Sequence, residues 1–185
     1  MSSLPQIDPA TATGPAAELL ANVQKAFGVV PNMMKVMANS PALLKGCLGL
    51  SGALAEGVLA ADVRERLALA TAEYHGCSYC LSAHTFVGSQ ILKVDADELE
   101  RARHAESNDP HMAALLALSD AIVRGRGAVA DSVLETARAA GVSNAEIAEV
   151  IGNIALNVLT NYFNIVAAVD NEWPVVPAHT HAHSH

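Results

Sequence analysis

Signals that start and stop helices punctuate this 185-residue chain almost from end to end, and they constrain its fold more than any other feature. Ser40-Pro41 and Asp109-Pro110 each place a capping side chain before a proline at the first helical position. Ser143-x-x-Glu146 has the spacing of a capping box. No segment has the alternating pattern of a strand, so the sequence predicts an all-α fold.

The intervals between these signals predict about eight helices in one domain, which spans residues 1–177. Gly76 is expected to end one helix, and Asp131 is expected to cap another. Asp95 and Glu98 form a box-like helix start. With the short segment 31–37 counted, the expected helices cover nine ranges: residues 15–27, 31–37, 41–55, 61–75, 78–91, 95–104, 110–125, 131–141 and 143–169.

Composition limits the function classes that are open to the chain. Hydrophobic residues make up 51% and charged residues 16%, which leaves little polar surface for a monomer, so a homo-oligomer is expected. The net charge of −8 argues against nucleic acid or an anionic membrane surface as a partner. No apolar run is long enough to span a membrane, and Met1–Pro5 lacks the features of a signal peptide, so a cytoplasmic location is expected.

Cys77 and Cys80 form a C-x-x-C pair, and His84 follows four residues after the second cysteine. On a helix these spacings place the three side chains along one stripe. If Gly76 ends the preceding helix, Cys77 lies at the start of the next one, where the free backbone N–H groups favour a thiolate. A nearby imidazole can take the thiol proton, so the cluster predicts a dithiol redox centre.

Three other interpretations of the cysteines compete with the redox centre, and the simplest is that the C-x-x-C pair occurs by coincidence and is inert. A zinc site that uses Cys77, Cys80 and His84 needs a fourth ligand, and the remaining cysteine, Cys47, has no partner at ligand spacing. A secreted disulfide framework needs more than three cysteines. No glycine-rich phosphate loop or flavin fingerprint is present, so no cofactor is expected and the electrons must come from an external thiol or protein reductant.

Several residues near the motif have weaker predicted roles. Glu73 either lines the site or caps a helix, and His75 is expected to be an exposed residue at a helix end rather than a second base. Cys47 is predicted to be an inert buried thiol. Tyr79 and Phe86 are expected to form the walls of an apolar pocket over the thiols. Met33, Met34 and Met37 are predicted to fill the core or an interface rather than bind a metal.

The last predicted helix carries a broad apolar face together with four asparagines. These side chains are expected mainly to cap or bridge neighbouring helices, with substrate binding as the alternative. The segments 61–86 and 143–168 share a pattern that hints at an internal helical duplication. The chain closes with a His-rich tail, residues 178–185, which is predicted to be disordered and able to chelate a transition metal. The four asparagines are Asn153, Asn157, Asn161 and Asn164.

The run from Glu65 through Cys77 and Cys80 to His84 resembles the core of the AhpD-type alkylhydroperoxidases in the carboxymuconolactone decarboxylase family. Redox members of that family have a glutamate twelve residues before the first cysteine and a histidine four residues after the second. The closing Trp173-Pro174 resembles the end of the sequences in a peroxidase-related subgroup of that family. The sequence departs from the AhpD enzyme at Tyr79, where that enzyme has a histidine.

The resemblance implies a thiol peroxidase that reduces organic hydroperoxides, with a trimer or hexamer as its assembly. Cys80 is expected to be the attacking thiol because His84 lies one helical turn away. Cys77, nearer the helix start and the surface, is expected to be the resolving thiol. By analogy with thioredoxin the roles would be reversed, with the N-terminal cysteine, Cys77, as the attacking thiol. Glu65 is expected to polarise His84. A decarboxylase-type lyase and a non-enzymatic thiol–disulfide or metal-binding module are the alternatives.

Overall fold

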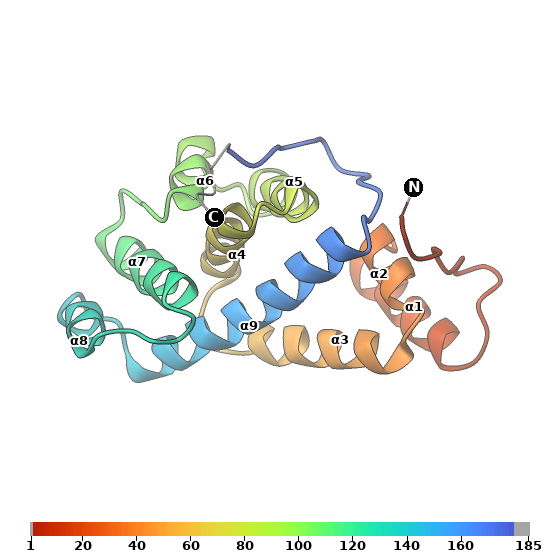
Figure 1. Cartoon of the computed structure of the whole chain (residues 1–185), viewed down its shortest axis with the longest axis horizontal. Coiled ribbons are helices and arrows are strands. Elements are labelled where there is room, and N and C mark those ends of the chain that lie inside the picture. The colour runs from red at the N-terminus through yellow and green to blue at the C-terminus, as the bar shows by residue number, and fades with distance from the viewer. Residues whose placement is uncertain (1, 180–185) are drawn as a thin grey trace.

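Helices account for all the regular structure in residues 2–179, which are the residues that the computed structural model describes (Figure 1). The predicted all-α class is therefore confirmed, and most predicted boundaries lie within a few residues of those observed. In chain order the elements are α1 (Gly14–Phe27), α2 (Asn32–Met37), α3 (Pro41–Ala55), α4 (Ala61–His75), α5 (Ser78–Phe86), a π-helical turn η1 (Val87–Ile91), α6 (Ala96–Arg103), α7 (Pro110–Arg124), α8 (Asp131–Ala139) and α9 (Asn144–Val166).

Capping side chains begin three of the longer helices as predicted. Ser40 accepts a hydrogen bond from the backbone N–H of the third residue of α3, and Asp109 does the same for α7. Ser143 and Glu146 form the complete capping box at the start of α9. Each such cap satisfies a backbone donor that would otherwise lack a partner, and contributes about 1 kcal/mol to stability.

Two predicted helix starts were wrong in detail. Asp131 is the first residue of α8 and not its cap, because Ala130 has the extended backbone of a capping position and Asp131 already lies in the first turn. Asp95 does cap α6, but it accepts from Asp97 N, and Glu98 does not complete a box. The Glu98 carboxylate instead accepts hydrogen bonds from the loop before α7, at Ser107 Oγ and Asn108 N.

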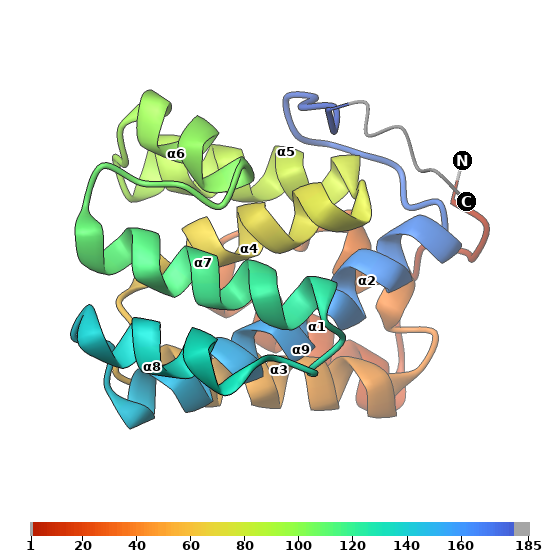
Figure 2. The same ribbon diagram turned by 60° about the vertical axis from the view of Figure 1, so that its left-hand side comes forward.

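Two groups of buried side chains hold the helices together. The larger group joins α4, α5, α6, α7 and α9, with α4 packed against the other four helices. The smaller group joins α1, α2 and α3. In Figures 1 and 2, α9 runs between α4 and α3, so one side of α9 packs against the larger group and the other against the smaller. A site between them can draw side chains from both.

The segment after α9 returns across the molecule as an arm, residues 167–179. Figure 1 shows that it leaves the end of α9 near α2, passes over α5 and reaches α6. Asn171 Nδ2 and Val176 N both donate to Ser82 Oγ of α5, each at 2.9 Å. Of the predicted tail, residues 178–185, only residues 178 and 179 are described, and residues 180–185 lie outside the described residues. Among residues 2–179, no helix is both long enough and apolar enough to cross a membrane.

Candidate active site

A two-residue turn separates α4 from α5 and fixes the position of the C-x-x-C pair. Gly76 has a φ of 69°, a left-handed conformation that side chains disfavour, so glycine suits this position. Cys77 N then donates to Ala72 O at 2.9 Å, which ends α4 as predicted. The Cys77 sulfur accepts from Cys80 N at 3.4 Å and caps α5. The predicted helix break at Gly76 and helix start at Cys77 are both observed.

Cys77 is not near the surface, contrary to the sequence-based expectation. It is 1% exposed, and Cys80 is 3% exposed. The reason is the turn itself, since the backbone hydrogen bond from Cys77 to Ala72 holds the cysteine against α4, inside the larger core. An external reductant therefore has no direct access to Cys77 from the helix start.

The environment of Cys80 favours its thiolate form. The largest influence on the Cys80 pKa is the thiol of Cys77, which donates to the Cys80 sulfur and lowers this pKa. Burial acts in the opposite direction and raises it. The charge of His84 and the amides of Asn164 and Asn161 also lower it, so that the pKa of Cys80 is about 7. Hydrogen bonding to Cys80 and burial raise the pKa of Cys77. The pair therefore divides into a reactive thiolate at Cys80 and a protonated donor at Cys77.

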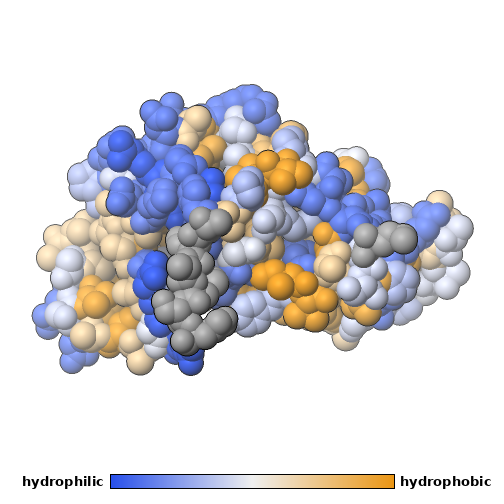
Figure 3. Space-filling model, turned by 45° about the horizontal axis from the view of Figure 1, so that its top comes forward, coloured by the Kyte–Doolittle hydropathy of each residue, from blue (hydrophilic) through white to orange (hydrophobic). Residues whose placement is uncertain are grey.

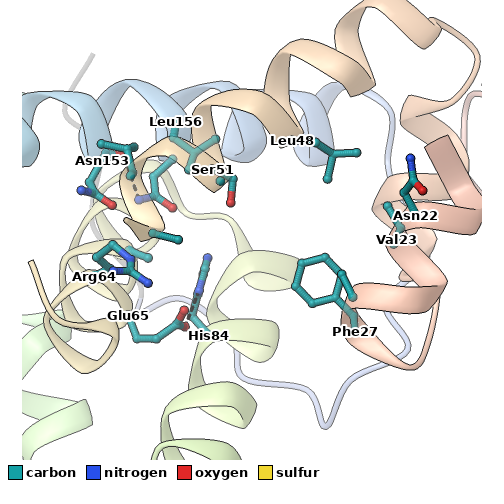
Figure 4. Close-up of a pocket in the computed structure, with 16 residues that line it drawn as sticks. Asn22, Val23, Phe27, Leu48, Ser51, Arg64, Glu65, His84, Asn153 and Leu156 are labelled. Carbon is teal, nitrogen blue, oxygen red and sulfur yellow. Dashed lines mark hydrogen bonds and ion pairs between the residues drawn. The ribbon is translucent and has the colours of Figure 1, made fainter. Parts of the chain in front are cut away.

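The predicted partner of Cys80 is held in place by a carboxylate. His84 Nδ1 lies 2.7 Å from Glu65 Oε2, across the interface between α5 and α4 (Figure 4). Burial lowers the His84 pKa, but the attraction of Glu65 and its hydrogen bond outweigh burial and raise it above the ordinary value. Because Nδ1 is engaged by Glu65, Nε2 is the ring nitrogen left to exchange protons with the site.

The reactive sulfur opens into a cavity between the two cores. A cavity of about 190 Å³ is lined by Cys80 and His84 together with Phe27, Met33 and Trp173, among other residues. A second, more polar cavity of about 480 Å³ shares His84 and Phe27 with the first. Figure 4 shows the second cavity, with Glu65 and Arg64 on one side of it and Phe27 on the other. His84 thus lies where an apolar compartment meets a polar one.

Only one of the two aromatic residues expected around the thiols lines the apolar cavity. Tyr79 does, and its hydroxyl donates to Glu172 Oε1 at 3.0 Å and accepts from Met33 N at 3.2 Å. Burial raises the Tyr79 pKa, so this residue is a neutral donor that ties α2 and the arm to α5. The expectation for Phe86 was wrong, because its ring packs against Trp173, which lines the cavity in its place.

The neighbouring acid and base lie away from the sulfur. Glu73 is buried in an ion pair with Arg103 of α6, at 2.8 Å, so neither predicted role, in the site or as a cap, describes its main contact. His75 is half-buried at the end of α4, with Nδ1 3.2 Å from Asn161 Oδ1. Its ring also meets Tyr74 and Tyr162 edge to face. Both residues position helices around the site.

The expected bridging role of the asparagines is observed for Asn161 and Asn164 but not for Asn153 and Asn157. Asn164 Nδ2 donates to Cys80 Sγ at 3.2 Å, so this asparagine contacts the reactive sulfur itself. Asn161 bridges α9 to α4, as expected, whereas Asn153 and Asn157 donate to carbonyls of α9 itself. The signal for Asn164 was its position on the buried side of an apolar helix, where an amide must find a polar partner.

Cys47 and Met37 are buried, and Met33 and Met34 are half-buried against the smaller core, so these methionines fill the core as predicted. Burial raises the pKa of Cys47, which agrees with an inert thiol, although its side chain lines the same apolar cavity as Cys80. Met33 and Met34 line that cavity as well, and Met33 Sδ accepts from Asn164 Nδ2 at 3.2 Å. Met37 fills the smaller core.

Solved structures share this architecture, whereas no family model and no curated protein sequence matches the chain. An AhpD-core, uncharacterized peroxidase-related protein from Ralstonia eutropha matches with a TM-score of 0.82 at 20% identity over 92% of both chains. An uncharacterized peroxidase-related protein from a Silicibacter species matches at 0.78 and 22%, over 90% of this chain and 88% of that one. The debrominase Bmp8 matches at 0.75 and 18%, over 90% of both chains. The chain therefore has the AhpD-like fold.

Replacing the donor at Cys77 tests how Cys80 is activated. Cys77→Ala removes the thiol that most lowers the Cys80 pKa, so this pKa should rise from about 7, and alkylation of Cys80 at pH 7 should slow by roughly tenfold. Cys77→Ser retains an O–H donor and is the matched control, with a midpoint nearer that of the wild type. Peptide mass spectrometry of iodoacetamide labelling from pH 5 to 9 measures each midpoint. Identical midpoints in the wild type and Cys77→Ala would contradict this account.

Proposed function

We propose that the chain is a thiol-dependent peroxidase that reduces organic hydroperoxides through a dithiol–disulfide cycle of Cys77 and Cys80. The observation that carries this proposal is the environment of the Cys80 sulfur. Cys80 lines an apolar cavity, and its pKa is lowered. His84, which is hydrogen-bonded to Glu65, lines the same cavity. A thiolate supplies the attacking electron pair, and the cavity takes the organic part of a hydroperoxide.

In the first step the Cys80 thiolate attacks the terminal oxygen of the hydroperoxide. The O–O bond breaks, Cys80 becomes a sulfenic acid, and the other oxygen leaves as an alkoxide. His84 holds the proton that Cys80 released, and its raised pKa keeps that proton available. Proton transfer from His84 to the alkoxide gives the alcohol and restores the neutral imidazole.

In the second step the Cys77 sulfur attacks the Cys80 sulfenic acid. The S–S bond forms, the S–O bond breaks, and the hydroxyl leaves as water with the proton of the Cys77 thiol. Helical spacing keeps the two sulfurs within one turn, so little backbone movement is needed. An external reductant in a reducing cytoplasm, either one protein dithiol or two molecules of a small thiol, then returns two electrons and two protons to the pair and is itself oxidised to a disulfide.

A second candidate function is reductive dehalogenation of an aromatic compound. The debrominase Bmp8 shares the fold, and a cysteine-to-alanine variant of it has been solved with 2,3,4-tribromopyrrole. The cavity over Cys80 has the aromatic residues Phe27, Tyr79 and Trp173 in its walls, which suits a flat ring. In that reaction the two thiols would supply two electrons, which convert a C–Br bond to C–H with release of bromide and one proton, and leave the same disulfide.

A single-turnover titration separates these chemistries. With a slight excess of cumene hydroperoxide, the reduced chain should lose two thiols, form a Cys77–Cys80 disulfide and release cumyl alcohol, with Cys47 left free. Cys77→Ser should stop at a sulfenic acid on Cys80 that dimedone traps, and Cys80→Ser should not react. Bromide release from a brominated pyrrole, with no consumption of peroxide, would instead support dehalogenation. Full peroxide consumption by Cys80→Ser would refute the peroxidase cycle, and absence of bromide release from the wild type would refute dehalogenation.

Assembly into a symmetric homo-oligomer, a trimer or a hexamer, is the second part of this proposal. Exposed apolar side chains cluster on the C-terminal half of α9, where Val166 is 80% exposed and Tyr162 and Ile165 are about half exposed. Figure 3 shows further hydrophobic patches on one face of the molecule. Burial of such patches between copies stabilises an assembly by about 25 cal/mol per Å² of apolar surface.

Light scattering at low micromolar concentration tests the assembly. The wild type should have a mass several times the 19.2 kDa of one chain, and Ile165→Glu should shift the protein to smaller species. Ser132→Glu, an exposed position in the first turn of α8, is the matched control and should leave the mass unchanged. A monomeric mass for the wild type would show that α9 does not mediate assembly.

A further inference from the structure

The end of the arm meets two side chains of α6 that have metal-binding chemistry. His179 of the arm lies over Glu100 and His104, and the two imidazole rings stack at 4.9 Å with 15° between their planes. His179 Nε2 lies 3.2 Å from Glu100 Oε1, and His104 Nε2 lies 3.5 Å from the same oxygen. Among residues 2–179, this is the one group of three or more histidine, cysteine or acidic side chains whose donor atoms all lie within 4.8 Å of one another.

These separations match the geometry of a tetrahedral metal centre. Zinc binds imidazole nitrogen and carboxylate oxygen at about 2.0–2.2 Å, which places neighbouring ligand atoms about 3.3 Å apart. Both nitrogens are already at about that distance from Glu100 Oε1. Two imidazoles with one carboxylate favour zinc, copper or nickel over calcium or magnesium, which prefer all-oxygen ligand sets.

The surroundings of His179 orient it for this role. Its backbone N–H donates to Glu73 Oε1 at 2.7 Å, and its ring Nδ1 faces the buried pair of Glu73 and Arg103, at 3.4 and 3.3 Å respectively. A carboxylate beside the second ring nitrogen is the usual support of a metal-binding histidine, because it holds the proton on that nitrogen and turns the other toward the metal. Arg103 Nη2 can only donate, so it competes with Glu73 Oε1 for Nδ1. Nε2 offers its lone pair to a metal beside Glu100 when the Nδ1 proton is held by Glu73 and the hydrogen bond from Arg103 is given up.

The sequence supplies further ligands directly after this cluster. His181, His183 and His185 follow at alternate positions in the tail, outside the described residues. A tetrahedral centre with three ligands from the folded chain has one position left, which a water molecule can fill. The proposed site therefore consists of described residues alone.

We propose that Glu100, His104 and His179 bind one divalent metal ion of the zinc type, which fastens the arm to α6. The site does not use Cys77, Cys80 or His84, so it is separate from the C-x-x-C cluster. Its consequence is structural, because the arm also carries Trp173, which lines the cavity over Cys80, and Val176, which hydrogen-bonds to α5. A metal at its end would hold that wall of the cavity in place.

Zinc binding to the full chain tests the site. The Cys77→Ser/Cys80→Ser variant serves as the background, so that the reactive thiols cannot chelate the metal, and calorimetry with zinc chloride should give one tight site per chain. His104→Ala and Glu100→Gln should each weaken binding by at least tenfold. His111→Ala is the matched control and should have no effect, since His111 also pairs with a glutamate, Glu146 at 2.8 Å, but is not a member of this cluster.

A second set of variants separates the folded site from the tail. With His181, His183 and His185 all replaced by alanine, zinc should still bind, and hydrogen exchange at the Val176 amide should slow when zinc is added. Retention of full affinity in His104→Ala, together with loss of binding in the triple alanine variant, would overturn the proposal and assign zinc to the tail alone. Absence of zinc binding by the full chain would overturn it as well.

Discussion

The turn at Gly76 and Cys77 is the constraint on which the site depends. Its left-handed glycine reverses the chain within two residues, so α4 and α5 lie against each other. That packing brings Glu65 of α4 to His84 of α5, at 2.7 Å, although 19 positions separate them in the sequence. The same turn places Cys80 in the first turn of α5, near free backbone N–H groups. The thiolate and its acid–base partner thus follow from one local break in a helix.

The helices were predictable from sequence because their signals are local. Ser40, Asp109 and Ser143 cap as expected, since a cap needs only its own side chain and the next three residues. The errors at Asp95 and Asp131 came from backbone detail, because a residue caps only when its own φ and ψ are outside the helix. The spacing of the C-x-x-C pair and the resemblance to a known family predicted four site residues, Cys77, Cys80, His84 and Glu65. In the structure Glu65 contacts His84, and His84 lines the same cavity as Cys80.

Contacts between distant segments could not be predicted in this way. Asn164 reaches Cys80 from 84 positions away, and Trp173 reaches the cavity from the arm. Neither contact has a local signature, because each depends on how α9 and the arm lie across α5. Cys77 was expected near the surface from its place at a helix start. The packing of that start against α4 buries it, so in the proposed cycle a reductant would approach from the side of Cys80 and its cavity.

The relay of Glu65, His84 and Cys80 is the central claim, and Trp173 offers a direct probe of it. This residue, the one tryptophan of the chain, lines the cavity over Cys80, so its fluorescence should change when the sulfur is oxidised. Stopped-flow mixing with cumene hydroperoxide between pH 5 and 9 then gives the rate constant of the first step. His84→Ala should lower that constant at pH 7 by tenfold or more, and Glu65→Gln by a smaller factor, because losing Glu65 lowers the pKa of His84. Equal rate constants for the wild type and both variants across this range would contradict the relay.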